Sequence, residues 1–265
     1  MRNLIQTFQT ISKDFLVMVV DYLLPPRCGL CSQKVMTAGN ICGACFQQLS
    51  MISKPCCYSC SLPFDVPTPE RSSCGQCLQT QPEYDRAFSA VVYGGAAKRL
   101  VLQLKHGQQY AASSVMIKQM VSVVLSSGLC LQCHETTFVV PVPLHWSRLA
   151  KRKFNQSALL AQGIAKALKY HYRPALLQRK KATQSQGGLG KEDRNKNVRG
   201  AFTVNKNWSF DSVANARVFL IDDVYTTGAT VQECARELKK YGVKKVYVVT
   251  YARVVKGWMF SELSF

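Results

Sequence analysis

Four C-x-x-C pairs lie within fifty residues near the start of this 265-residue chain and limit how that segment can fold. Each C-x-x-C turn can present two thiolates to one metal ion, and two such turns complete a tetrahedral zinc site. So short a segment, with few large side chains, cannot build a sufficient apolar core, so bound metal would supply much of its folding energy. The predicted zinc ligands are Cys28, Cys31, Cys42, Cys45, Cys57, Cys60, Cys74 and Cys77.

Sequential pairing of these turns is the simplest arrangement, and a crossed pairing stays open. Within the two sequential couples the gaps are 10 and 13 residues, which suit zinc-ribbon knuckles. The alternative, disulfides in a secreted domain, needs an oxidising compartment. The first 26 residues have neither the clean apolar run nor the small-residue cleavage site of a secretory signal. We therefore expect structural zinc in a cytoplasmic protein.

The remaining cysteines carry weaker signals. Cys56 is adjacent to a predicted ligand and is expected to be a bystander. Cys130 and Cys133 form a fifth C-x-x-C pair that has no partner pair, and its role stays open. Cys234 falls in a helix-like pattern and is expected in the core.

Apolar residues recur at helical spacing through residues 1–26, which predicts an amphipathic helix. Lys13 and Asp14 interrupt the apolar run that a secretory signal would need. We expect the helix to pack on its own domain or on a partner, and a membrane-surface anchor is the less favoured alternative. No apolar run reaches the roughly 18–20 residues that span a bilayer. The predicted domains are this helix, a zinc-ribbon domain over residues 27–80 and an α/β domain over residues 81–265.

The positive charge is concentrated in one stretch. The chain has 34 Lys and Arg against 15 Asp and Glu, a net charge of +19, and residues 145–199 hold 14 of the basic and 2 of the acidic residues. The positive charges of such a stretch would repel one another. We therefore prefer an anion-binding surface to a merely solvated face as its interpretation. Nucleic acid, a phosphate-rich ligand and an anionic membrane are the partner classes that this charge favours.

Strand-like and helix-like segments alternate after residue 84, which predicts a mainly parallel α/β sheet. The expected strands are 86–93, 137–142, 217–221 and 245–251. The expected helices are 96–105, 111–126, 157–168 and 229–241, with Asn155 as the N-cap of the third. Residues 179–200 are polar, basic and contain glycine, so we predict a long mobile loop there.

The segment from Val218 to Thr230 reads VFLIDDVYTTGAT and predicts a ligand-binding site. Four apolar residues predict a buried strand, and Asp222 and Asp223 stand at its carboxyl end, where parallel α/β sheets bind ligands. Hydroxyl residues and Gly228 then open a helix whose free N–H groups and positive dipole end favour an anion. Adjacent carboxylates before a phosphate cradle suit a sugar phosphate. Neither a Walker A loop nor a G-x-G-x-x-G fingerprint occurs.

This segment resembles the phosphoribosyl-pyrophosphate (PRPP) motif of type I phosphoribosyltransferases, and with the cysteine-rich module in front the chain resembles the ComF (ComFC) family. That family is linked to DNA uptake in natural competence. The likeness covers roughly residues 20–255. It includes Pro25-Pro26-Arg-Cys28, Leu104-Lys105-His106-Gly107, Val140-Pro-Val-Pro143, Phe154-Asn155-Gln156, Thr183-x-x-Gln186 and Arg194-x-x-Asn197. One departure is Lys153, where the family commonly has Gly.

The resemblance implies a role for each part of the motif. Asp222 and Asp223 would hold the ribose hydroxyls and steady the transition state. Lys105, His106 and Gly107 would correspond to the pyrophosphate loop, with Mg²⁺ on the leaving pyrophosphate. The 5-phosphate would be bound by Thr226, Thr227, Gly228, Ala229 and Thr230. Arg148, Arg152, Lys153 and Arg194 are the candidates for pyrophosphate or nucleic-acid contacts.

The resemblance and the residues leave three functions open, of which we expect the first. The first is a competence protein that binds single-stranded DNA in the cytoplasm and carries a PRPP site, with Trp146 and Phe154 as candidate stacking residues. The second is a phosphoribosyltransferase acting on a base or amine, although no acceptor-recognition segment is identifiable. The third is a zinc-ribbon adaptor that docks onto a helicase or another uptake protein.

Overall fold

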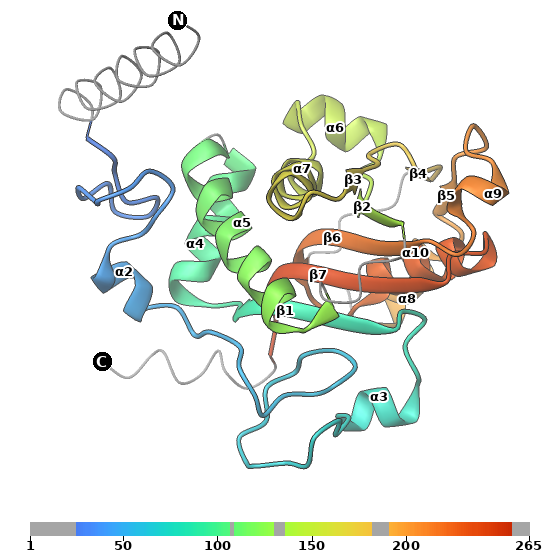
Figure 1. Cartoon of the computed structure of the whole chain (residues 1–265), viewed down its shortest axis with the longest axis horizontal. Helices are drawn as coiled ribbons and strands as arrows, with labels where there is room; N and C mark the ends of the chain where they lie inside the picture. Colours follow the sequence, from blue (N-terminus) through green and yellow to red (C-terminus); the bar gives the residue numbers. More distant parts are fainter. Residues whose placement is uncertain (1–24, 107–108, 130–135, 182–190, 256–265) are drawn as a thin grey trace, which may run out of the picture.

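The computed structural model describes residues 25–106, 109–129, 136–181 and 191–255. Its centre is a five-stranded sheet in the order β1-β7-β6-β2-β3, in which every neighbouring pair is parallel (Figure 1). The strands of this sheet are β1 (Arg86–Val92), β7 (Lys245–Arg253), β6 (Arg217–Tyr225), β2 (Thr137–Pro141) and β3 (His171–Tyr172). A separate antiparallel pair consists of β4 (Leu177–Arg179) and β5 (Phe202–Val204).

Helices cover both faces of the central sheet. One face packs against α4 (Gly95–His106), α5 (Gln109–Ser126) and α7 (Gln156–Leu168). The opposite face packs against α10 (Ala229–Lys240) and the β4–β5 pair, with α8 (Lys191–Val198) beside α10. Side chains of β6 alternate between the two cores, since Val218 belongs to one and Phe219 to the other. Because β6 is buried on both faces, its sequence contains a continuous apolar run.

The cysteine-rich segment runs along the outer edge of β1. The N–H groups of Ile52 and Ala87 donate to the carbonyls of Ala90 and Ser59, at 2.9 and 2.8 Å, so the segment supplies partners that an edge strand otherwise lacks. Its short helices are α2 (Gly43–Gln47) and α3 (Gly75–Gln79). In Figure 1 the part with α2 lies beside α4 and α5, whereas the part with α3 lies below β1.

The predicted parallel sheet with flanking helices is confirmed, and Asn155 caps α7 by accepting a hydrogen bond from the Ser157 N–H at 3.0 Å. The prediction of a loop through residues 179–200 is wrong in part, because α8 occupies Lys191–Val198. The strand that carries the acids also extends to Tyr225, since pairing with β7 continues to Arg253. Sequence reasoning assigned no helix to α6 (Trp146–Arg152) or α9 (Phe210–Val213).

Two further expectations concern segments that lie outside the described residues. The predicted N-terminal helix falls almost wholly within residues 1–24, and Cys130 and Cys133 also lie outside the described residues. Among the helices of the described residues, none has the length and apolarity needed to cross a membrane.

Candidate functional site

The sheet topology creates a crevice where β2 and β6 end side by side. The chain leaves β2 towards α7 on one face and leaves β6 towards α10 on the other. Ligands of parallel α/β sheets bind at such a switch point, outside the carboxyl ends of the strands. A pocket of about 210 Å³ occupies this place, lined by Val142 and Leu144 after β2 and by Asp222 to Thr226 of the β6 end. Its size suits a small polar ligand rather than a drug-sized one, which takes roughly 300–1,000 Å³.

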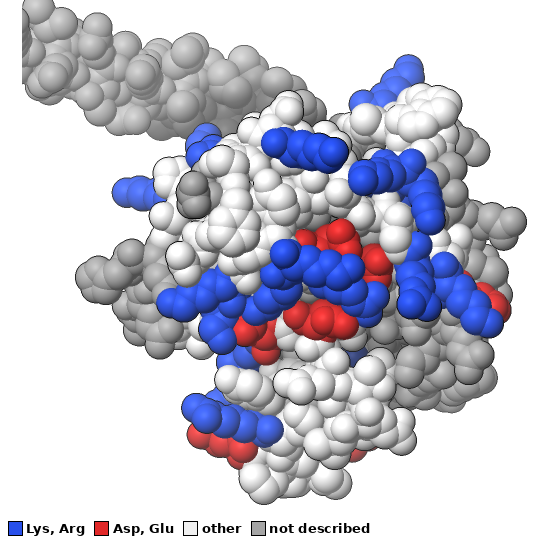
Figure 2. Space-filling view, turned by 90° about the vertical axis from the view of Figure 1, so that its right-hand side faces the viewer, with Lys and Arg blue, Asp and Glu red and all other residues white. Residues whose placement is uncertain are grey.

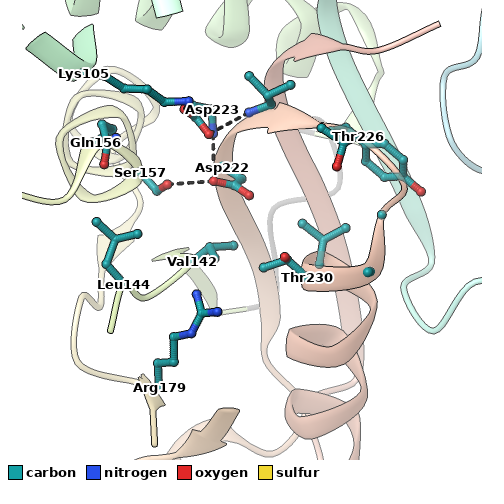
Figure 3. Close-up of a pocket in the computed structure, with 15 residues that line it drawn as sticks. Lys105, Val142, Leu144, Gln156, Ser157, Arg179, Asp222, Asp223, Thr226 and Thr230 are labelled. Carbon is teal, nitrogen blue, oxygen red and sulfur yellow. Dashed lines mark hydrogen bonds and ion pairs between the residues drawn. The ribbon is translucent and has the colours of Figure 1, made fainter. Parts of the chain in front are cut away.

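Two adjacent carboxylates lie at one side of the pocket, each with its own partner (Figure 3). Oδ1 of Asp222 accepts hydrogen bonds from the Ser157 hydroxyl and from the Asp223 N–H, both at 2.9 Å. Asp223 forms an ion pair with Lys105, whose Nζ lies 2.9 Å from Oδ2. The three residues predicted to be catalytic, Lys105, Asp222 and Asp223, thus meet at one place although they come from α4 and β6.

Asp222 holds its proton more tightly than an ordinary aspartate. Burial, and next the negative charge of Asp223, raise its pKa from 3.8 to about 7. The hydrogen bonds from Ser157 and the Asp223 N–H oppose this rise only in part. The carboxyl group can therefore change its charge near neutral pH, which is typical of functional sites and also occurs in structural networks.

The loop after β6 leads directly into the N-terminus of α10, which faces the same pocket. Gly228 is the N-cap and has a φ of 80°, and its Cα carries no side chain that would obstruct the turn. Thr226, Gly228, Ala229 and Thr230, which are four of the five residues predicted to bind the 5-phosphate, line the pocket. Thr227 is absent from the lining, and its hydroxyl instead accepts a hydrogen bond from the Ala229 N–H at 3.4 Å. Free N–H groups at the start of a helix favour an anion here.

Among the pocket residues that sequence reasoning missed are Gln156, Ser157 and Arg179. Gln156 and Ser157 begin α7, directly after Asn155, whose Nδ2 donates to the Val142 carbonyl at 3.1 Å and ties the helix to the end of β2. Gln156 belongs to the Phe154-Asn155-Gln156 motif of the family resemblance, in which only Phe154 and Asn155 had predicted roles. Arg179 comes from β4, and its guanidinium extends towards the pocket in Figure 3; its sequence neighbourhood indicated only a basic loop.

Several of the other predicted anion contacts lie outside the residues that the structure describes. Gly107 lies outside the described residues, as do the side chains of His106, Arg148, Arg152 and Arg194. Lys153 is exposed at the C-cap of α6 and does not line the pocket. Trp146, at the start of α6, is 72% exposed, whereas Phe154 is partly buried.

The eight predicted zinc ligands form two groups in sequential order, Cys28-Cys31-Cys42-Cys45 and Cys57-Cys60-Cys74-Cys77, with the ligand atoms of each group within 4.8 Å of one another. All cysteines of the described residues are free. The Sγ atoms of Cys60 and Cys74 are 3.6 Å apart, well beyond the roughly 2.05 Å of a disulfide.

The donor chemistry of both groups fits structural Zn²⁺. Four converging thiols without an open position match a structural site. Backbone N–H groups of Leu30 and Cys74 donate to Sγ of Cys28 and Cys57, at 3.4 and 3.2 Å, as they would to a ligating thiolate. The Cys60 thiol, followed by the Cys74 N–H, lowers the pKa of Cys57 to about 4. Of the other cysteines, Cys56 belongs to neither group and Cys234 is fully buried, as predicted.

Comparison with known proteins agrees with this architecture. A double zinc ribbon domain matches residues 19–78, and a phosphoribosyl transferase domain matches residues 155–262. Competence protein F of Haemophilus influenzae is 30% identical over 86% of this chain and 96% of its own length. The DNA utilization protein YhgH is 29% identical in Escherichia coli K12 and 31% identical in Salmonella typhi, in both cases over 88% of this chain and 99% of the relative. The chain belongs to the competence protein F family, with a double zinc ribbon ahead of a phosphoribosyltransferase domain.

Proposed function

We propose that the pocket binds the 5-phosphoribose group of PRPP or a related sugar phosphate. The observation that carries this proposal is the convergence of two carboxylates and a helix N-terminus on one small pocket. Asp222 and Asp223 offer acceptors for vicinal hydroxyls, and the α10 N-terminus offers N–H donors to a phosphate. Lys105 adds a cation at the same pocket.

Magnesium belongs to this proposal as a companion of PRPP, since Mg²⁺ is commonly held through substrate phosphates. If the pocket is catalytic, Mg²⁺ would neutralise a departing pyrophosphate. The carboxylates of Asp222 and Asp223 would steady the positive charge that develops on the sugar. Release of pyrophosphate in the presence of a base or amine would identify the protein as a transferase, and binding without release would identify a ligand sensor.

Single-stranded DNA is the proposed macromolecular partner. The supporting features are the basic stretch 145–199 and α6 within it, where Trp146 is 72% exposed and Lys153 is exposed. An exposed aromatic ring can stack on a base of any sequence while cations bind the backbone. The relatives named for competence and for DNA utilization support a role in DNA uptake during transformation.

A second basic face suits DNA less well. On the side where α10 lies in Figure 1, Figure 2 shows basic side chains directly beside acidic ones. Lys239 and Lys245 both pair with Asp85, at 2.6 and 2.8 Å, and Arg236 pairs with Glu83 at 3.0 Å. Because these cations already have acidic partners, we place the DNA contacts on α6 and its surroundings.

The remaining parts of the proposal concern organisation and location. The limits 27–80 and 81–265 are the proposed domain limits, and a helicase or another uptake protein is the proposed protein partner. We propose a cytoplasmic site of action, because thiolate zinc ligands persist in a reducing compartment.

Titration calorimetry of the zinc-loaded protein with PRPP and Mg²⁺, with and without a short single-stranded DNA, tests the two ligands together. We expect saturable PRPP binding whose affinity shifts when DNA is bound, as linkage requires of coupled sites. DNA affinity should fall with rising salt, and Lys153→Ala should reduce the slope of log affinity against log salt by about 0.7. DNA binding without PRPP binding would refute the sugar-phosphate site and leave a nucleic-acid adaptor.

A further inference from the structure

Arg253, the last residue of β7, lies between the second cysteine group and the phosphate loop. Its side chain is buried, and Nη2 donates to Sγ of Cys60 at 3.2 Å. The Cζ atom of the same guanidinium lies 4.3 Å from the centroid of the Tyr225 ring. Tyr225 lines the pocket and immediately precedes Thr226. One buried cation therefore contacts two parts of the chain that are far apart in sequence.

The second cysteine group needs a counter-charge at this place. Four thiolates around one Zn²⁺ carry two net negative charges, and Cys57, Cys60 and Cys74 are 1%, 2% and 8% exposed. A buried charge is costly unless it is paired and hydrogen-bonded. The Cys74 N–H supplies one hydrogen bond, to Cys57, and Arg253 supplies a full positive charge, to Cys60. The first group is less enclosed, since its Cys31 is exposed.

The phosphate loop depends on the position of Tyr225. Its hydroxyl is 2.8 Å from the hydroxyl of Tyr84, and the two rings meet edge to face. A Cβ atom added to Gly228 would lie 2.2 Å from the Tyr225 hydroxyl oxygen, so the turn at the start of α10 is folded directly against this side chain. The Tyr225 carbonyl also accepts a hydrogen bond from the Val254 N–H, next to Arg253, at 2.9 Å. A shift of the Tyr225 ring would therefore move the loop.

We propose that Arg253 is a positioning residue that couples the second zinc centre to the phosphate loop. With zinc bound, the thiolates hold the guanidinium, the guanidinium holds the Tyr225 ring by a cation–π contact, and the ring supports the turn at Gly228. Loss of zinc from this centre removes the anion that holds Arg253 and loosens the loop. The coupling to sugar phosphate rests on the proposed function, whereas the role of Arg253 at the zinc centre does not.

Linkage gives a test in the unmodified protein. If the metal strengthens sugar-phosphate binding, the sugar phosphate must strengthen metal binding by the same factor. The affinities for zinc are measured by equilibrium competition with a chromogenic chelator, with and without saturating ribose 5-phosphate. We expect ribose 5-phosphate to raise the affinity for one of the two zinc ions about 5-fold or more, within the usual range of coupling. Cys31→Ser, which retains the second centre, should show this increase, and Cys77→Ser, which retains the first, should not.

Two substitutions of Arg253 separate its charge from its shape. Arg253→Met removes the charge, so we expect one zinc ion to be bound about 10-fold more weakly and the affinity for ribose 5-phosphate to fall about 5-fold or more. Arg253→Lys keeps the charge but lacks the planar group that lies over a ring. It should retain zinc within about twofold of the wild type and still bind ribose 5-phosphate more weakly, a split that a purely structural role would not produce.

Three results would each contradict a different claim: the coupling, the role of Arg253 or the proposed function. A wild-type protein that binds ribose 5-phosphate without a change in either zinc affinity refutes the coupling alone. Wild-type affinity of Arg253→Met for both zinc ions refutes the role of Arg253 at the zinc centre. A wild-type protein that binds neither ribose 5-phosphate nor PRPP overturns the proposed function, and the coupling with it.

Discussion

The Nζ atom of Lys105, near the end of α4, lies 2.9 Å from Oδ2 of Asp223 in β6, so a helix on one face of the sheet is joined to the strand that carries the acids. The pair is largely shielded from solvent, with 25% and 15% of the two side chains exposed. Sequence resemblance relates the turn after Lys105 to pyrophosphate binding. The ion pair itself places the lysine at the pocket.

Replacement of Lys105 should distinguish pyrophosphate from 5-phosphate contacts. We expect Lys105→Met to weaken PRPP binding about 10-fold, the loss of one charge-assisted hydrogen bond, and ribose 5-phosphate binding by no more than about threefold. Calorimetric titration with each ligand measures the two effects. Lys98→Met changes an exposed lysine of the same helix and should leave both affinities unchanged. Equal losses for both ligands would contradict the assignment of Lys105 to the pyrophosphate side.

Gly228 tests the phosphate loop. Gly228→Ala would place a Cβ atom 2.2 Å from the Tyr225 hydroxyl oxygen, in a residue whose φ of 80° already disfavours a side chain. The loop must shift, so the affinity for ribose 5-phosphate should fall at least about 10-fold, equivalent to about 1.4 kcal/mol. Gly43→Ala is the matched control, because an added Cβ there meets nothing within 4 Å. The idea fails if the two variants bind the ligand equally well.

The raised pKa of Asp222 predicts a pH dependence of stability. In the folded protein burial, and next Asp223, raise this pKa from 3.8 to about 7, so the folded state binds more protons than the unfolded state between these values. The contribution of Asp222 to stability is therefore present at low pH and is lost as pH rises through about 7. From pH 5 to pH 8 the free energy of unfolding of the wild type should fall, relative to Asp222→Asn, by at least about 1.4 kcal/mol, the equivalent of one pKa unit. Urea denaturation at both pH values measures it, and a constant difference would argue against the shift.

Lys153 occupies a turn whose backbone geometry suits glycine. The residue caps α6 with a φ of 64°, in the left-handed region that side chains disfavour. Lys153→Gly should raise the free energy of unfolding by about 0.5–1 kcal/mol, since relief of strain exceeds the added entropy of the unfolded chain. Lys153→Ala removes the same charge and keeps the strain, so it should stay within about 0.5 kcal/mol of the wild type. Thermal or urea unfolding of the three proteins decides between a backbone effect and a charge effect.

The parts of the fold that the sequence predicts well are those encoded locally. Strand β6, its acids and the start of α10 follow one another in a single segment. The C-x-x-C spacing predicts the eight zinc ligands and makes the sequential grouping the simplest one. Helix α8 escaped prediction because its residues Lys191–Val198 are almost all polar and have no apolar stripe. It packs on α10 through Val198, and the Gly200 N–H just beyond its end donates to the buried Glu233 at 2.7 Å. That contact forms only in the folded chain, so the local sequence does not indicate it.

The missed parts of the site are long-range contacts. The hydrogen bond from Ser157 to Asp222 joins residues that are 65 positions apart, and the contact from Arg253 to Cys60 spans 193 positions. Neither pair has a spacing that a motif could reveal. Ser157 meets Asp222 because the parallel strands bring their carboxyl ends to one edge of the sheet. Arg253 meets Cys60 because the cysteine-rich segment follows β1 at that edge.

The most direct test of the proposed sugar-phosphate site is calorimetric titration of PRPP with Mg²⁺ into the wild type and into the double variant Asp222→Asn, Asp223→Asn, with the zinc content of both measured. Loss of two charged acceptors should reduce the affinity at least about 100-fold, while both proteins retain two zinc ions, because the cysteine groups contain neither acid. Natural transformation should be lost in parallel. A double variant that binds PRPP and transforms like the wild type would contradict the site proposed for Asp222 and Asp223.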